Sequence, residues 1–285
     1  MKKVLAVYRA GFTDYDGLDT YRVMPTRNIP IETIEPFIFL NHHGPQVYSA
    51  GNQGLPFGPH PHKGFETVTL IVEGDLVHKD STGFSSNIKA GGVQWMTAGK
   101  GIIHSEQSSL EFMEKGGPVE ILQLWINLPS SLKDAEPSYT GLQNNELPVI
   151  EINEQVSVKL ISGHWDSYTA PIQSISNVDL FCIDMKKDGS LVIEVPSEKT
   201  ILFYVIRGNV SVNGTDAETH EIIEFGHEGE RISMESNEDS LIFFGYATPN
   251  NEPLAANGPF VMNTPAEIRQ AFVDYNEGKF GVWPH

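Results

Sequence analysis

Hydrophobic and polar positions alternate along most of this chain in short runs. Apolar, β-branched segments such as 65–72 (FETVTLIV) and 119–128 (VEILQLWINL) are separated by clusters of Gly, Pro, Asn and Asp. Side chains of a strand point alternately to opposite faces, so this pattern is typical of short strands joined by tight turns. The turn at 73–75 predicts a hairpin with the following run, 76–79. We therefore predict an all-β protein.

The second half of the chain repeats this style. Short strands are predicted at 156–162, 179–185, 191–195, 201–206, 209–212, 222–225 and 241–245. Short strands at regular spacing are the mark of a sandwich or a barrel. The first half contains two candidate metal ligands, His60 and His62, which are discussed below. If Gly208 corresponds to Gly74, their positions in the second half are occupied by Glu194 and Pro196, so this half is expected to lack a metal site.

One helix is predicted, near the end of the chain. Thr264 is its N-cap, Pro265 its first residue, and Glu267 completes a capping box. Apolar residues follow at a spacing of three to four, and Gly278 ends the helix. Such an amphipathic helix is expected to pack on the outside of a barrel.

Length and composition bound the organisation. A chain of 285 residues suggests two domains. The polar, Pro-flanked segment 131–148 is expected to be a linker, with one domain at 1–130 and the other at 149–285. Apolar residues make up 40% of the chain, as in a packed globular protein.

Charge and cysteine content exclude several classes of function. The net charge of −18 argues against direct binding to nucleic acid, which needs clustered Lys and Arg. A single cysteine, Cys182, excludes an internal disulfide and fits a reducing compartment. We find no signal peptide and no apolar stretch near the ~20 residues that span a bilayer. A soluble cytoplasmic protein that binds no membrane is expected.

Four potential metal ligands occur as two closely spaced pairs. His60 and His62 lie two residues apart in GPHPHKG, and His104 and Glu106 lie two apart in GIIHSEQ. Residues two apart in a strand point to the same side, so each pair presents two ligands on one face. Three imidazoles and a carboxylate suit a single divalent transition metal better than magnesium or calcium. Four protein ligands leave room for substrate or dioxygen only on an ion that accepts five or six neighbours, as iron does, so we expect a catalytic metal.

Each pair alone also has a simpler interpretation. His60-Pro61-His62 fits a turn at a strand entrance, and His104-Ser105-Glu106 fits a solvated corner. Two such pairs, each beside glycine-rich turns and separated by β-patterned sequence, favour the metal site.

Other polar residues near the site are assigned lesser roles. Alternation puts Glu66 on the ligand face, although a bulge would redirect it, and Glu106 is the expected carboxylate ligand. His78 is expected to face outward. His42 and His43 are expected to form a polar strand end, with a role in lining the pocket as the alternative. Three further histidines are not assigned to metal: His164, His220 and His227. Candidates for an apolar pocket over the metal are Phe57, Trp95 and Met96.

At these residues the chain resembles the pirins, two-domain members of the cupin superfamily. The runs HPHKGFETVTLIVEG, GGVQWMTAGKGIIHSE and GPFVMNTPAEIRQAFVDYNEGKFG carry the resemblance, which covers essentially the whole chain. It implies two tandem cupin β-barrels (a bicupin of double-stranded β-helix domains) with a short C-terminal helix. It also implies one metal in the first barrel, held by His60, His62, His104 and Glu106. Iron, as Fe(II), is the expected ion, with zinc, nickel, manganese and copper as alternatives.

The resemblance further implies a quercetin 2,3-dioxygenase-like activity. The expected reaction opens a flavonol ring with O₂ and releases carbon monoxide, with a small aromatic substrate and Glu106 as the catalytic base. The alternative is a non-catalytic, metal-dependent regulatory protein with a protein partner, as some animal members are. A cupin isomerase acting on sugar phosphates would need basic residues in the pocket, and only Lys63 and Lys100 lie near, so it ranks below both.

Overall fold

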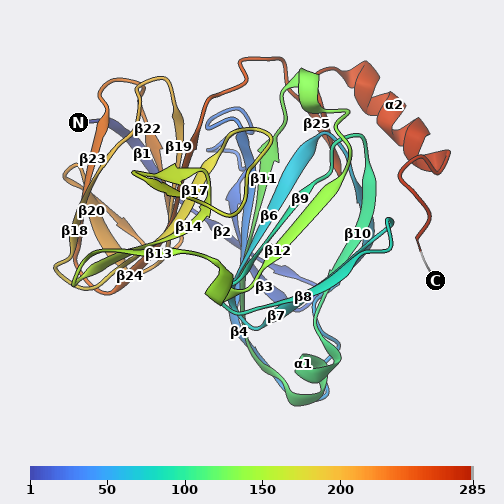
Figure 1. Cartoon of the computed structure of the whole chain (residues 1–285), viewed down its shortest axis with the longest axis horizontal. Coiled ribbons are helices and arrows are strands. Elements are labelled where there is room, and N and C mark those ends of the chain that lie inside the picture. The colour runs from blue at the N-terminus through green and yellow to red at the C-terminus, as the bar shows by residue number, and fades with distance from the viewer. Residues whose placement is uncertain (284–285) are drawn as a thin grey trace. The chain divides into compact units, whose positions relative to one another are not determined.

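The computed structural model describes residues 1–283 and confirms the all-β prediction (Figure 1). It has two compact units, each built from a seven-stranded and a four-stranded antiparallel sheet, as in cupin domains. One unit comprises residues 12–21, 38–145 and the segment from Asn250 onward, and we call it the histidine barrel. The other comprises residues 1–11, 22–37 and 146–249, and we call it the apolar barrel.

The histidine barrel holds both predicted ligand pairs. Its four-stranded sheet has the order β5 (Phe57–His62), β10 (Ile102–Gln107), β7 (Asp75–Asp80) and β8 (Ser85–Lys89). Its seven-stranded sheet has the order β12 (Ser138–Leu142), β9 (Val93–Thr97), β6 (Phe65–Glu73), β11 (Gly117–Asn127), β4 (Phe37–Tyr48), β3 (Leu18–Met24) and β2 (Gly11–Tyr15). Short helices are α1 (Leu110–Lys115), η1 (Ser130–Leu132) and η2 (Asn144–Glu146).

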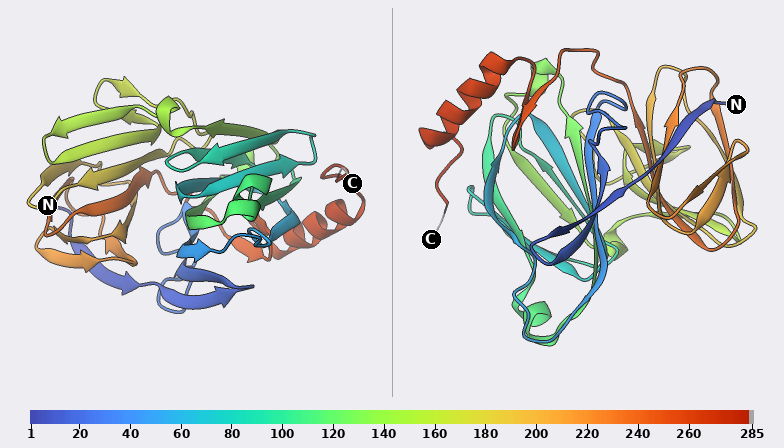
Figure 2. Two further views of the ribbon diagram at one scale, coloured as in Figure 1. Left: turned by 90° about the horizontal axis from the view of Figure 1, so that it is seen from below. Right: turned by 180° about the vertical axis from the view of Figure 1, so that it is seen from behind.

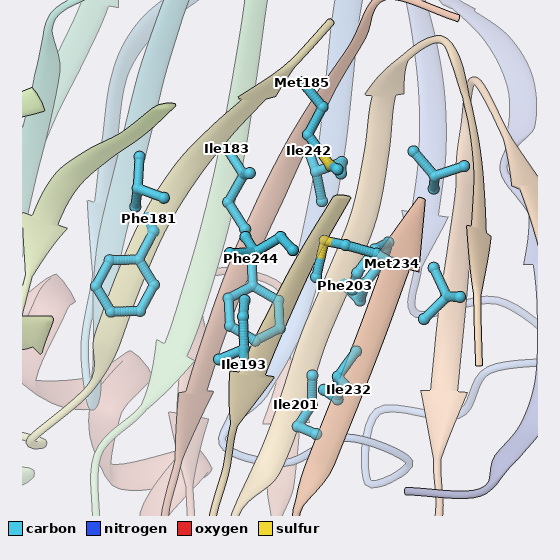
Figure 3. Packing of buried hydrophobic residues seen from close by; sticks show 14 of the residues in the cluster. Phe181, Ile183, Met185, Ile193, Ile201, Phe203, Ile232, Met234, Ile242 and Phe244 are labelled. Carbon is cyan, nitrogen blue, oxygen red and sulfur yellow. The ribbon is translucent and has the colours of Figure 1, made fainter. Parts of the chain in front are cut away.

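The apolar barrel has the same two-sheet plan. Its four-stranded sheet has the order β18 (Ser190–Glu194), β23 (Arg231–Ser236), β20 (Asn209–Val212) and β21 (Thr215–Glu218). Its seven-stranded sheet has the order β1 (Val4–Arg9), β22 (Glu221–Phe225), β19 (Thr200–Arg207), β24 (Ser240–Ala247), β17 (Asp179–Met185), β14 (Val156–Ser162) and β13 (Val149–Asn153). The hairpin of β15 (His164–Trp165) and β16 (Tyr168–Thr169) belongs to the same unit. Residues from both sheets fill its interior, among them Phe203, Met234 and Phe244 (Figure 3).

Each end of the chain completes the barrel that is built mainly from the other half of the sequence. Strand β1 pairs with β22 in the apolar barrel (Figure 2). At the other end, β25 (Ala255–Asn257), β26 (Phe260–Met262) and α2 (Pro265–Asn276) belong to the histidine barrel. Ile268 and Ala271 of α2 pack in one apolar cluster with Ile103 of β10, so the helix lies on the outside of this barrel, as predicted. The capping box of Thr264 and Glu267 is confirmed.

The segment predicted as a linker, 131–148, contains structure of its own. Strand β12 lies within it and pairs with β9, from Ser138 opposite Thr97 to Leu142 opposite Val93. Lys133 of the same segment is buried, and its ammonium donates to the carbonyl oxygens of Gly64 and Val261 at 2.9 and 3.0 Å. A buried charge is tolerated because such acceptors replace water. This lysine therefore ties the C-terminal segment to the histidine barrel.

Among residues 1–283, none of the helices has the length and apolar content needed to cross a lipid bilayer.

Candidate metal centre

Three histidines on two paired strands meet inside the histidine barrel. Strands β5 and β10 are antiparallel, with His104 opposite His60 and Ile102 opposite His62. Ligand nitrogens of the three rings lie within 4.8 Å of one another, and the Nε2 atoms of His60 and His104 are 3.0 Å apart. The two-residue spacing brings His60 and His62 to one face, as the sequence predicted.

Burial favours the neutral form of two of these rings, His62 and His104. The exposed fractions of His62 and His104 are 2% and 0%. Desolvation lowers the pKa of His62 well below its usual value; the charge of His60 adds to this, while the Pro259 carbonyl has a smaller, opposite effect. Desolvation likewise lowers the pKa of His104, with further contributions from His62, His60 and His78. A neutral imidazole has a lone pair available for a metal.

The donor set fits a metal ion. The Nδ1 atom of His60 lies 2.8 Å from the carbonyl oxygen of Gly58, which only accepts, so the proton sits on Nδ1 and the lone pair of Nε2 faces the cluster. Both ring nitrogens of His62, and Nδ1 of His104, are buried without a hydrogen bond. Buried polar atoms of this kind are costly unless something satisfies them. A divalent transition ion would bind the facing lone pairs of the three rings.

Glu106, the fourth predicted ligand, does not belong to the three-histidine group that the structure brings together. It is buried, and its carboxylate accepts hydrogen bonds from three side chains of the facing sheet. Thr69 Oγ1 donates to Oε1 at 2.9 Å, Gln123 Nε2 donates to Oε2 at 2.5 Å, and Gln94 Nε2 also donates to Oε1. We call Thr69, Gln94 and Gln123 the glutamate clamp.

Sequence reasoning did not assign the glutamate clamp to the site. The available signal was a polar residue within a mostly apolar buried strand: Thr69 in FETVTLIV, Gln94 in VQWMT and Gln123 in VEILQLWINL. Such residues must find partners inside the protein. Their common partner, Glu106, lies on a different sheet and is distant in sequence, so the pattern alone does not identify it.

Glu66 has separate partners. Its carboxylate accepts hydrogen bonds from Trp95 Nε1 and Thr97 Oγ1, both at 2.9 Å. It is not part of the three-histidine group, and Trp95, a candidate for the pocket wall, donates to it.

The prediction that His78 faces outward is wrong. Its side chain is fully buried and stacks on Tyr139 with ring centroids 4.1 Å apart, and its Nε2 lies 3.0 Å from Asp80 Oδ2. In β7 the half-buried Val77 takes the other face. The apolar Val77 misled the prediction, because it shares the outer face of β7 with the exposed Lys79. His78 therefore lies near the metal centre, with its ring centroid 5.5 Å from that of His104.

The prediction of a polar strand end at His42 and His43 is also wrong. Both lie within β4, which continues through Gly44 to Tyr48, and both are buried. His42 Nε2 lies 2.9 Å from a carboxylate oxygen of Glu120, and His43 Nδ1 lies 2.9 Å from Thr20 Oγ1. These partners replace water, so the histidines are part of the barrel interior.

The apolar barrel has hydrophobic residues at the positions of the predicted ligands. His78 lies four residues after Gly74, and Val212 lies four residues after Gly208, so the two positions correspond. His78 pairs with Glu106, and Val212 pairs with Met234, so Met234 is the counterpart of Glu106. The same register matches His104 with Ile232 and His60 with its partner Ile193. By continuation, Val195 matches His62. All four counterparts, Ile193, Val195, Ile232 and Met234, belong to one buried apolar cluster.

The counterparts expected from sequence, Glu194 and Pro196, are each one residue too late. A slip of one residue in a strand moves every side chain to the other face, so the sequence alignment matched interior histidines with outward positions. Within residues 1–283, no group of three metal-ligating side chains is found besides His60, His62 and His104. His164, His220 and His227 are thus outside any such group.

We expect the metal-free protein to lose stability as the pH falls below about 6.5. The unfolded chain then binds protons at His62 and His104, whereas the folded chain does not, because burial lowers both pKa values. Each ring contributes a slope of up to about 1.4 kcal/mol per pH unit, and the slope vanishes above the ordinary pKa. Urea unfolding between pH 5 and 7.5 measures it. A stability that does not change over this range, or an equal slope in His62→Ala, would contradict the expectation.

Two such barrels, one with a buried three-histidine centre, define a two-domain cupin protein. The pirin family model matches residues 17–126, and the model of the pirin C-terminal cupin domain matches residues 180–281. The chain belongs to the pirin family, which confirms the resemblance seen in the sequence.

Individual relatives agree with this assignment. Pirin-1 of Arabidopsis thaliana is 38% identical over 255 residues, which are 87% of this chain and 84% of the relative. The crystal structure of a quercetin 2,3-dioxygenase from Acinetobacter baumannii superposes with a TM-score of 0.93 at 36% identity, over 99% of both chains. The bacterial pirin YhhW from Escherichia coli, solved in complex with nickel(II), has the same fold, with a TM-score of 0.67 at 24% identity over 86% of this chain and 100% of that one.

Proposed function

We propose that this protein is a metal-dependent dioxygenase that opens the ring of a flavonol such as quercetin with O₂ and releases carbon monoxide. The observation that carries the proposal is a cluster of three histidines, two of them buried, in the same barrel as the buried carboxylate of Glu106. The similarity in structure to the quercetin 2,3-dioxygenase of A. baumannii supports it.

The ion would be held by His60, His62 and His104, with Glu106 as the fourth ligand. Fe(II) is the expected ion, and zinc, nickel, manganese and copper are alternatives; nickel is the ion bound by the E. coli pirin. When bound, the ion would acidify a hydroxyl group of the substrate and activate dioxygen.

The protein's own residues would bind the substrate and move its proton. Glu106 is the only member of the proposed site that accepts a proton at an oxygen, and in this role it takes the proton of the substrate hydroxyl as a general base. Around His62 the lining is aromatic: the rings of Phe65 and Trp125 lie 4.9 and 5.1 Å from its ring centroid. Such a lining favours a flat aromatic substrate and excludes water.

Oxygen uptake tests the proposal. Protein loaded with Fe(II) is mixed with quercetin, and oxygen consumption and carbon monoxide release are followed together, with His62→Ala as the matched variant. We expect one carbon monoxide per dioxygen consumed, and neither in the variant. Uptake that persists in His62→Ala would argue against the site. A tightly held ion without any uptake would favour the alternative, a metal-dependent regulatory protein that binds a protein partner.

A further inference from the structure

The Glu106 carboxylate is held by a hydrogen-bond network whose donors all point toward it. Gln94 Nε2 donates to Glu106 Oε1 and to Thr69 Oγ1, and the hydroxyl of Thr69 donates to the same carboxylate oxygen. Behind Gln94, the Tyr139 hydroxyl donates to Gln94 Oε1 at 3.2 Å. An ionised carboxylate only accepts, which fixes the amide nitrogen of each glutamine toward it. All of these donors therefore converge on one carboxylate, directly or through Gln94.

The fold itself does not require these polar residues. Thr69 lies five residues before Gly74, and Phe203 lies five residues before Gly208, so the two positions correspond. Thr69 pairs with Gln123, and Phe203 pairs with Phe244. On the other side of the same strands, Thr69 pairs with Gln94, and the register of β19 with β22 places Ile223 at the corresponding position. In the apolar barrel the glutamate clamp is thus replaced by Phe203, Ile223 and Phe244, in the same buried cluster as Met234, the counterpart of Glu106 (Figure 3). The clamp positions and the predicted ligand positions are therefore all polar in the histidine barrel, and their counterparts in the apolar barrel are all apolar.

The clamp limits what Glu106 can offer an ion. A carboxylate has about four lone-pair sites. Two hydrogen bonds occupy Oε1 and one occupies Oε2, which leaves roughly one site, on Oε2. Binding through both oxygens would need a clamp bond to break. Glu106 can therefore bind an ion through a single oxygen at most while the clamp is intact.

We propose that Thr69, Gln94 and Gln123 are positioning residues whose hydrogen bonds compete with the ion for the carboxylate of Glu106. Glu106 is then a weak ligand that binds through one oxygen. It can dissociate from the ion while the clamp still holds it, and it can then act as a base. This inference rests on the metal site proposed above and adds the residues that set how firmly Glu106 is bound.

The proposal predicts that weakening the clamp strengthens metal binding. Gln123→Met keeps the side-chain length but removes the donor to Oε2, and Thr69→Val keeps the shape but removes a donor to Oε1. Each variant removes one hydrogen-bond donor to the buried carboxylate of Glu106 in the metal-free protein, and a bound ion then takes the place of that donor. We expect the dissociation constant for Co(II) to fall on the order of tenfold. Removal of an outer partner of a metal ligand typically has the opposite effect, a loss of affinity of about 10–100-fold, so the direction of the change decides the test.

The experiment measures Co(II) affinity by chelator competition and the visible absorption of bound Co(II), which reports the number of ligands. A double-mutant cycle supplies the control: Gln123→Met is made both in the natural chain and in Glu106→Gln. The expected result is tighter binding and an altered spectrum in the natural background, and no change of either in the Glu106→Gln background.

Three results would overturn the inference. The first is an affinity that falls or does not change in both Gln123→Met and Thr69→Val, with circular dichroism showing a folded chain. The second is an equal gain in the Glu106→Gln background, because the clamp would then act through something other than Glu106. The third is a natural chain that binds no Co(II), which removes the metal site itself. Absence of oxygen uptake with quercetin, by contrast, removes the proposed reaction but leaves the clamp's effect on affinity to stand.

Discussion

Replacing Glu106 by glutamine is expected to lower quercetin-dependent oxygen uptake by about 10²–10⁴-fold, because the amide cannot take the proton of the substrate hydroxyl. The ion should remain bound, since the three histidines are intact. Steady-state oxygen uptake and metal content per chain measure the two effects separately.

Glu66→Gln is the matched control for this prediction. Glu66 is as deeply buried as Glu106, but its hydrogen-bond donors are Trp95 and Thr97, and it is not one of the proposed metal ligands. We expect it to leave turnover per bound ion unchanged. Full turnover in Glu106→Gln would remove the role of base from Glu106, and an equal loss in Glu66→Gln would show that the effect is structural.

Replacing Phe244 by alanine should produce the largest loss of stability, about 3–5 kcal/mol, which is typical of a buried phenylalanine in a tightly packed core. Phe244 is fully buried in the apolar barrel, and its ring centroid lies 6.0 Å from that of Phe203 and 6.3 Å from that of Phe181. Its removal leaves a cavity between the two sheets (Figure 3). Denaturant unfolding followed by circular dichroism measures the effect.

Val192→Ala is the matched control for Phe244→Ala. Val192 lies on β18 of the same barrel, but its exposed fraction is 47%. A surface change of this kind should alter the free energy of unfolding by no more than about 0.5 kcal/mol. Similar losses in the two variants would mean that Phe244 does not pack as described.

The three-histidine cluster was predictable because it depends on local rules. His60 and His62 share a face by strand alternation, and His104 needs only one strand pairing, β5 with β10, to join them. The same holds for the helix at the end of the chain, because its cap and its breaker are encoded within a few residues of Thr264 and Gly278.

The errors arose where alternation along a strand does not reveal which face is buried. For β7 and β4, alternation distinguishes two sides but not which side is solvent, so the sequence did not reveal that His78, His42 and His43 are buried. Burial there depends on strands from distant parts of the chain and on partners such as Asp80 and Glu120. The clamp on Glu106 was missed for the same reason, since it joins two sheets.

Each end of the chain packs in the barrel that is built mainly from the other half of the sequence, and this affects the order in which contacts form during synthesis. Strand β1 is made long before its partner β22: Tyr8 donates a hydrogen bond to Glu224, 216 residues away. The histidine barrel waits as well, because β26 and α2 follow the strands of the apolar barrel. Contacts between such distant segments form slowly. Strand β1 therefore stays unpaired in the nascent chain until β22 is made, and chaperones are suited to protect it.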